Sequence, residues 1–154
     1  MQAENIEAAY QPFAQVLREG GFTEPDAGWG AAQIASHIAL SNEVFSELAD
    51  QVRAGQVPAF DNTPTWADAE LAAYAAKFDG LPGLADAVLS SGARAAAAYA
   101  AMSDDQRAVK LPTTIWHEGQ IVQDEPAAIG DLLVGNADFH LNMHLAQLRA
   151  LRPE

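Results

Sequence analysis

Apolar residues recur at helical spacing through most of this chain, in segments separated by glycine and proline. Residues 6–18 place four large apolar side chains on one side and are followed by a pair of glycines, which predicts a helix that stops there. Residues 31–54, 82–102 and 127–151 show the same periodicity over longer runs. The pattern therefore predicts four main helices.

Two segments depart from this pattern. After a proline-containing loop at residues 57–65, Thr65 resembles an N-cap with Asp68 three positions later, which predicts a short helix to about residue 78. Between residues 105 and 125, apolar positions lie among Pro112, two threonines and the Glu118-Gly119 pair, as in a short hairpin or an extended loop. We expect this excursion to form a wall of a pocket. The fold class predicted is all-α: a helical bundle with a short extra helix and a loop or small hairpin before the last helix.

Three histidines fall on the apolar stripes of the predicted helices. His140 and His144 lie one turn apart, so both imidazoles can reach one cation from a single rigid element. His37 is the only ionisable side chain on the apolar face of its own segment. Because polar rings in a core need partners, the three residues are predicted to form a metal site. A hydrogen-bonded core cluster without metal is the alternative.

The expected ligand set constrains the metal and its chemistry. Three neutral imidazoles leave a divalent cation its full charge and at least one open position. Zinc fits this set best, while nickel and ferrous iron suit imidazole and water as well. Each ligand ring should donate its second N–H to an acceptor, and Asn136, one turn before His140, is a candidate.

Other residues are candidates for contact with a substrate. Arg94 could hold a carboxylate, because its guanidinium matches that group in a bidentate manner. Trp116 could line the pocket beside the excursion. A solvated surface charge and simple loop packing are the respective alternatives. His117 is left off the ligand set, since a loop histidine is more often merely exposed. No catalytic residue is assigned.

Length and charge narrow the class of protein. With 154 residues, 49% of them hydrophobic, the chain is expected to be one domain spanning residues 1–154 with a substantial core. Its 21 acidic and 8 basic side chains give a formal net charge of -13, which opposes contact with phosphate backbones and anionic lipids. A nucleic-acid partner is therefore not expected.

The sequence lacks membrane-targeting patterns and cysteine, which bears on where the protein is found and on its chemistry. The start of the chain lacks a signal-peptide pattern and no apolar run is long enough to span a bilayer, so we expect a cytoplasmic protein without membrane contact. The chain has no cysteine, which excludes disulfides and thiolate ligands. Any thiol chemistry would need an external thiol.

The string W-G-A-A-Q-I-A-S-H-I at residues 29–38, taken with the terminal H-x-x-x-H pair, resembles the DinB-like four-helix superfamily. This superfamily includes the mycothiol-dependent maleylpyruvate isomerases and related thiol-dependent S-transferases. The resemblance implies an up-down-down-up bundle whose second and fourth helices supply His37, His140 and His144 as ligands. In the isomerases a glutamate matches His140, whereas the DinB-like and bacillithiol-transferase branches have histidine there.

From these features we expect a metal-dependent enzyme that acts on a small molecule, most simply a thiol-dependent S-transferase, with a thiol-dependent isomerase as a related alternative. A low-molecular-weight thiol, activated at the metal, would be the cosubstrate that attacks an electrophile. A noncatalytic small-molecule binding or resistance protein and a metal-dependent hydrolase are the alternatives. A homodimer is expected, because the superfamily often pairs its bundles and because Leu132, Phe139 and Met143 form a second apolar face on the last helix.

Overall fold

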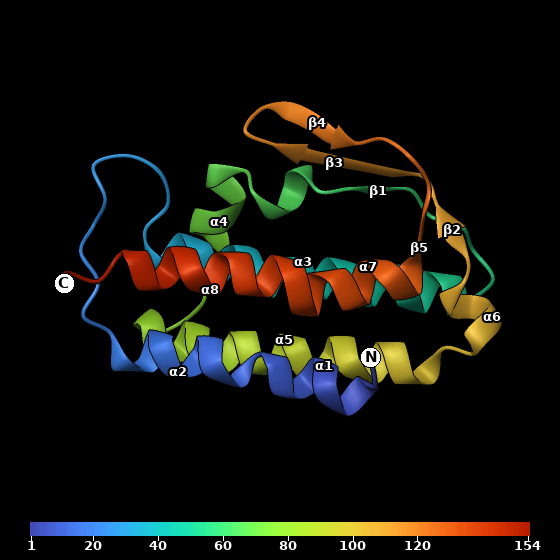
Figure 1. Cartoon of the computed structure of the whole chain (residues 1–154), viewed down its shortest axis with the longest axis horizontal. Helices are drawn as coiled ribbons and strands as arrows, with labels where there is room; N and C mark the ends of the chain where they lie inside the picture. The colour runs from blue at the N-terminus through green and yellow to red at the C-terminus, as the bar shows by residue number, and fades with distance from the viewer.

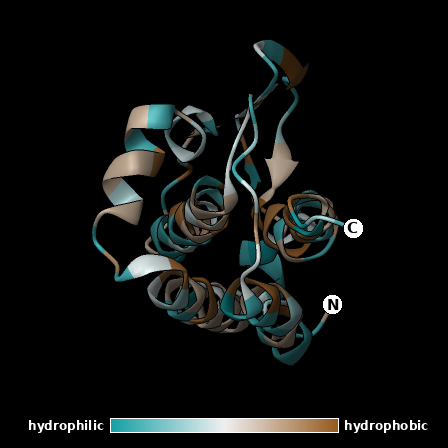
Figure 2. Ribbon diagram, turned by 90° about the vertical axis from the view of Figure 1, so that its left-hand side faces the viewer, coloured by the Kyte–Doolittle hydropathy of each residue, from teal (hydrophilic) through white to brown (hydrophobic).

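The computed structural model describes residues 1–154 and is dominated by helices that run side by side (Figure 1). The helices are α1 (Ala3–Ala9), α2 (Gln11–Glu19), α3 (Ala31–Arg53), α4 (Asp68–Ala75), α5 (Gly80–Ala101), α6 (Asp104–Arg107), α7 (Ile129–Gly135) and α8 (Leu141–Ala150). A 3-10 turn, η1 (Thr63–Thr65), precedes α4, and a π-helical segment, η2 (Asn136–His140), joins α7 to α8. Figure 2 shows the long helices end-on, with much of their hydrophobic surface turned toward one another.

The prediction of an all-α fold is wrong. Five short strands are present: β1 (Phe60–Asp61), β2 (Lys110–Leu111), β3 (Thr113–His117), β4 (Gln120–Gln123) and β5 (Ala127–Ala128). They form a three-stranded sheet in the order β1-β3-β4 and a two-stranded sheet of β2 and β5. In Figure 1, β3 and β4 lie together beyond the long helices. The physical reason is that residues 105–125 meet backbone partners from distant segments, with β1 pairing parallel to β3.

Strands β3 and β4 form a hairpin, which Asn62 links to the segment before η1 in addition to the pairing of β1 with β3. Glu118 and Gly119 form its turn with φ angles of 50° and 77°, the left-handed conformation that a tight two-residue hairpin turn requires. Asn62 holds the strand, because its Oδ1 accepts from the Trp116 backbone N–H at 2.8 Å. Its Nδ2 donates to the Trp116 carbonyl at 3.0 Å. The hairpin is therefore tied to the segment that leads into η1.

The predicted first helix, residues 6–18, is interrupted. Two helices, α1 and α2, replace it, and the break falls at Tyr10. Pro12 accounts for the interruption, because it lacks a backbone N–H and its ring obstructs the preceding turn. Tyr10, at the break, lies in the core, with 1% of its surface exposed.

The buried apolar side chains form two clusters. The larger contains 21 residues, including Phe13, Ile34 and Leu141, and it joins the helices around the first half of α3. The smaller contains 11 residues, including Phe45, Phe60 and Leu111, and it joins the second half of α3 to the strands. The strands thus complete a part of the core that helices alone leave open.

None of the helices combines the length and the apolar character that spanning a membrane would need.

Candidate metal centre

Three histidines meet in the interior, one from α3 and two from the continuous segment formed by η2 and α8. His37 lies on α3, His140 ends η2, and His144 lies on α8. Each offers one ring nitrogen to a set in which all the nitrogens lie within 4.8 Å of one another, so the group could hold a metal ion. His37 and His144 are buried, with 5% and 7% of their surfaces exposed, and His140 is partly buried.

The three rings are arranged symmetrically. Their centroids are 4.8 Å apart for His37 and His140, 4.7 Å for His37 and His144, and 4.6 Å for His140 and His144. Each pair is close to perpendicular, with interplanar angles of 77°, 71° and 84° respectively. Trp29 covers one side, with its ring centroid 5.0 Å from that of His37 and 6.1 Å from that of His144.

The outer nitrogen of every ring is hydrogen-bonded to an oxygen that can only accept. His37 Nδ1 contacts the backbone carbonyl of Thr65, and His144 Nδ1 lies 2.8 Å from the side-chain oxygen of Gln147. His140 Nδ1 lies 2.8 Å from Asn136 Oδ1. Each Nδ1 therefore carries the proton and each Nε2 keeps a lone pair.

The inner nitrogens consequently face one another as acceptors. His37 Nε2 and His140 Nε2 are 2.8 Å apart, and with both protons on Nδ1 neither atom can donate to the other. Two lone pairs at that distance repel unless a cation lies against both. Oriented Nε2 atoms with oxygen partners behind them are the usual arrangement around protein-bound zinc. The residues present therefore fit a divalent metal.

Electrostatics keep the histidines neutral. Burial lowers the pKa of His37 to about 4, with a further contribution from the neighbouring His144 and an opposing one from the Thr65 carbonyl. Burial, followed by the charges of His37 and His144, lowers the pKa of His140 to about 2. Burial also lowers the pKa of His144. At neutral pH a proton therefore does not fill the space between the rings, and the neutral imidazole is the form that binds metal.

The local backbone accounts for part of this arrangement. The π-helical segment η2 begins at Asn136 and ends at His140, so the orienting oxygen and the ring that it contacts share one irregular turn. Single π turns within α-helices are frequent at functional sites. Residues 127–151 were predicted as one continuous helix, and this turn was not foreseen.

Thr65 has a different role from the one predicted for it. We expected it to cap a short helix, but α4 begins at Asp68 and its N-cap position is Ala67. Thr65 lies in η1, where its hydroxyl donates to the carbonyl of Asn62 at 2.7 Å. Its own carbonyl is then free to orient His37. Nothing in the local sequence signals this function, because the contact forms only in the folded chain.

Neither of the two residues predicted to contact a substrate, Arg94 and Trp116, belongs to the histidine group. Arg94, on α5, is about half exposed and its guanidinium is 3.9 Å from the carboxylate of Asp50. Trp116 lies in β3 with its backbone bound to Asn62, and its ring does not stack on any histidine. The tryptophan ring that lies against the histidines is that of Trp29.

His117, the fourth histidine, is outside the group. Its side chain is 61% exposed, and its Nε2 lies 3.9 Å from a carboxylate oxygen of Glu118 at the hairpin turn. It nevertheless lies close enough to His144 for its charge to contribute, after burial, to lowering the pKa of His144.

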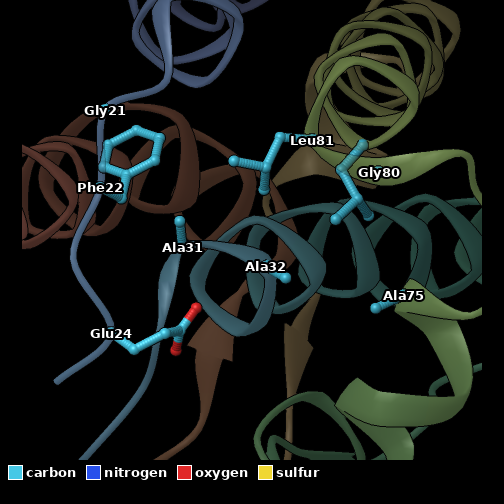
Figure 3. A pocket seen from close by; sticks show the side chains of 9 residues that line it. Gly21, Phe22, Glu24, Ala31, Ala32, Ala75, Gly80 and Leu81 are labelled. Carbon is cyan, nitrogen blue, oxygen red and sulfur yellow. The ribbon is translucent and has the colours of Figure 1, made fainter.

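A surface depression of about 360 Å³ lies near the start of α3 (Figure 3). It is lined by nine residues, which include Phe22, Glu24, Ala31 and Leu81. Figure 3 shows the Glu24 carboxylate beside Ala31. None of the three histidines and no residue of the excursion at 105–125 lines it, so this depression is distinct from the pocket predicted beside that excursion.

The chain was compared with protein-family models, with curated proteins and with solved structures, and no match was found in any of the three comparisons.

Proposed function

We propose that this protein binds one divalent metal ion through the Nε2 atoms of His37, His140 and His144, and that zinc is the metal. The observation that carries the proposal is the convergence of one ring nitrogen from each of three histidines, all within 4.8 Å of one another, in rings that each have an oxygen acceptor at Nδ1. Nickel and ferrous iron are the alternatives, because imidazole suits all three ions.

The ligand chemistry supports a catalytic use of the metal. Three neutral ligands leave the cation its full charge and an open coordination position, which is typical of catalytic zinc and unlike a closed structural site. A metal of this kind supplies Lewis acidity, which lowers the pKa of a thiol or a water that it contacts. No carboxylate belongs to the group to reduce that acidity.

We propose that the reaction is S-transfer from a low-molecular-weight thiol to an electrophilic small molecule. The support is the resemblance of residues 29–38 and of the terminal histidine pair to the DinB-like superfamily, to which we propose that the chain belongs. In such a reaction the sulfur forms a bond to an electrophilic carbon. The leaving group departs with its bonding pair, and the thiol proton passes to solvent. The chain has no cysteine, so the sulfur comes from the cosubstrate, and we place the protein in the cytoplasm, where such thiols are kept reduced.

Elemental analysis of the untagged protein, after dialysis against a weak chelator, tests the metal site first. We expect about one equivalent of zinc per chain. His140→Ala should lose the metal, while the control His117→Ala, which removes a histidine outside the group, should retain it. A protein that neither holds nor takes up zinc, nickel or iron would overturn the proposal.

Turnover tests the activity separately. Monobromobimane with N-acetylcysteine should give a fluorescent thioether and bromide at a rate that depends on bound zinc and is lost in His140→Ala. If the metal is present but no thiol and electrophile pair turns over, the S-transferase proposal fails. Hydrolysis of an ester without added thiol would instead assign the site to a hydrolase.

We also propose that the protein is a homodimer. Phe139, next to last in η2, is 76% exposed and Met143, one turn later on α8, is 39% exposed. Large apolar side chains left exposed on one helix face are typical of an interface. Sedimentation equilibrium should give twice the chain mass, and Phe139→Glu should give the monomer. A wild-type monomer at high concentration would contradict the proposal.

A further inference from the structure

A buried network of polar side chains runs from the metal centre into the apolar core. Tyr10, Asn42, Ser91 and Asn136 are 1%, 0%, 5% and 6% exposed, and each is hydrogen-bonded to at least one of the others. They come from the α1–α2 junction, α3, α5 and η2, which pack side by side (Figure 1). Burying several polar groups is costly unless they are satisfied, and an apolar core would need none of them.

The bonds of this network run in one direction. Ser91 Oγ donates to the backbone carbonyl of Val88 at 3.1 Å, so its oxygen can accept from Asn42 Nδ2, also at 3.1 Å. The other end of the Asn42 amide, Oδ1, accepts from the Tyr10 hydroxyl at 2.7 Å. The Asn42 amide is thus held with its oxygen away from Ser91.

That orientation is passed on to the metal centre. Asn42 Oδ1 also accepts from Asn136 Nδ2 at 2.8 Å, which leaves Asn136 Oδ1 directed at His140 Nδ1, likewise at 2.8 Å. An oxygen at this position requires the proton of His140 on Nδ1. The lone pair of His140 is therefore on Nε2, which faces His37 Nε2 at 2.8 Å.

The opposite orientation of the Asn42 and Asn136 amides would prevent His140 from binding a metal ion. If both amides turned over, Asn136 would present N–H to His140 Nδ1 and the imidazole proton would move to Nε2. That proton would then be donated to His37 Nε2, and His140 could no longer bind a metal ion. The orientation of two buried amides thus separates a metal-binding histidine cluster from a merely hydrogen-bonded one.

The packing around the network leaves it little freedom. The Tyr10 ring lies against Gly92, where a Cβ atom would come within 2.4 Å of Tyr10 Cδ2. Glycine at this point of α5 allows the hydroxyl of Tyr10 to reach Asn42. Burial raises the pKa of Tyr10 well above its ordinary value, so the hydroxyl stays protonated and remains a donor.

We infer that Asn42, supported by Tyr10 and Ser91, is a positioning residue that holds His140 in the Nδ1-protonated tautomer and so keeps its Nε2 available to the metal. Asn42 contacts no histidine itself; it acts through Asn136. This inference rests on the proposed metal site for its functional meaning, but the tautomer of His140 can be measured without metal.

Asn42→Leu is the variant that tests the inference, because leucine keeps the approximate volume and removes both polar ends. Ser46→Ala is the matched control: Ser46 is equally buried on α3, and its hydroxyl donates only to the backbone carbonyl of Asn42. Asn42→Asp provides rescue, since a carboxylate accepts from Asn136 and so preserves the direction of the bonds. Tyr10→Phe is a milder second variant should Asn42→Leu fail to fold.

The readouts are long-range ¹H–¹⁵N spectra of the histidine rings in metal-free protein and the Kd for zinc. We expect His140 protonated on Nδ1 in the wild type, in Ser46→Ala and in Asn42→Asp. In Asn42→Leu the proton should move toward Nε2 and the Kd should rise about 10-fold or more, the usual cost of losing an outer partner of a ligand. Tyr10→Phe should change the tautomer of His140 and the Kd for zinc in the same direction, but by smaller amounts.

The outcomes separate this inference from the proposed function. If the wild type binds zinc and Asn42→Leu leaves both tautomer and Kd unchanged, the inference is overturned while the metal site stands. If the wild type binds no metal but the tautomer shifts as described, the positioning role stands and the proposed function fails. A wild-type His140 protonated on Nε2 would also overturn the inference.

Discussion

The four histidines of this chain divide between two regions that treat the same side chain differently. His37, His140 and His144 lie on rigid helical segments, largely buried, with every Nδ1 directed at an oxygen. His117 lies at the hairpin turn, 61% exposed, with only a carboxylate of the adjacent residue near it. Burial and oriented acceptors therefore distinguish the three candidate ligands from His117.

Removing a histidine from each region should show the largest contrast. His37→Ala deletes one of three inner nitrogens, and we expect zinc affinity to fall by more than about 100-fold, beyond the 10- to 100-fold cost of losing an outer partner. His117→Ala should leave the affinity unchanged. Isothermal titration with zinc under chelator competition measures both. Equal losses in the two variants would mean that the buried histidines bind zinc no better than the exposed one.

Acid should destabilise the buried region. The unfolded chain takes up a proton on His37 near the ordinary pKa of 6.5, whereas in the folded protein burial lowers this pKa to about 4. Between these values the unfolded state binds more protons, so stability falls as the pH drops from 6.5 and the loss is complete below 4. The difference corresponds to roughly 3 kcal/mol.

Urea denaturation of the metal-free protein across this range measures the effect. His37→Gln, which can still donate to the Thr65 carbonyl, is the control, because it removes the titrating group. The free energy of unfolding of the wild type should fall more steeply with acid than that of the variant. Parallel curves would mean that His37 titrates normally.

Two glycines, one against the buried ring of Tyr10 and one in the hairpin turn, should differ in what an added methyl group costs. Gly92→Ala places a methyl group 2.4 Å from the Tyr10 ring, and we expect it to destabilise the protein by about 1–3 kcal/mol through overpacking. Gly119→Ala meets open space, so only its φ of 77° matters, at a cost of about 1 kcal/mol. Thermal unfolding ranks the two. In addition, only Gly92→Ala should weaken zinc binding, because Tyr10 supports Asn42.

The smallest effect is expected on the outer strand of the hairpin. Val122, in β4, is 61% exposed, and Val122→Thr should change the free energy of unfolding by less than about 0.5 kcal/mol. Chemical denaturation is sufficient to measure this. A larger loss would mean that the hairpin surface is covered, by a partner or by a second copy of the chain.

The histidine group could be predicted in outline, but the orientation of its rings could not. Helical periodicity placed His37, His140 and His144 on inward faces, because residues four apart share one side of a helix. The acceptors Thr65 and Gln147 were not anticipated. Gln147 could have been found, since it lies three residues after His144 on the same helix. Thr65 could not, because it is distant in sequence from His37.

For the fold too, local patterns could be predicted from the sequence and long-range contacts could not. The periodicity of apolar residues indicated the long helices, because burying one face of a helix imposes a local repeat. We expected a short hairpin or an extended loop at residues 105–125, and β3 and β4 form a hairpin there. The pairing of β1 with β3 and of β2 with β5 was not predicted, and the all-α prediction was wrong. Strands of two residues carry no pattern of their own, and the parallel pairing of Phe60 with Thr113 depends on segments far apart in the chain.

Helical periodicity in the sequence is therefore enough to predict which side chains face inward, and three of these side chains are imidazoles. The nitrogen that carries the proton in each ring depends on the folded structure, because the contacting oxygens are the backbone carbonyl of Thr65, the side chain of Gln147 and the side chain of Asn136, whose amide is oriented by Asn42. Helical periodicity is a property of neighbouring residues. Hydrogen-bond direction in a core is a property of groups that meet only when the chain has folded.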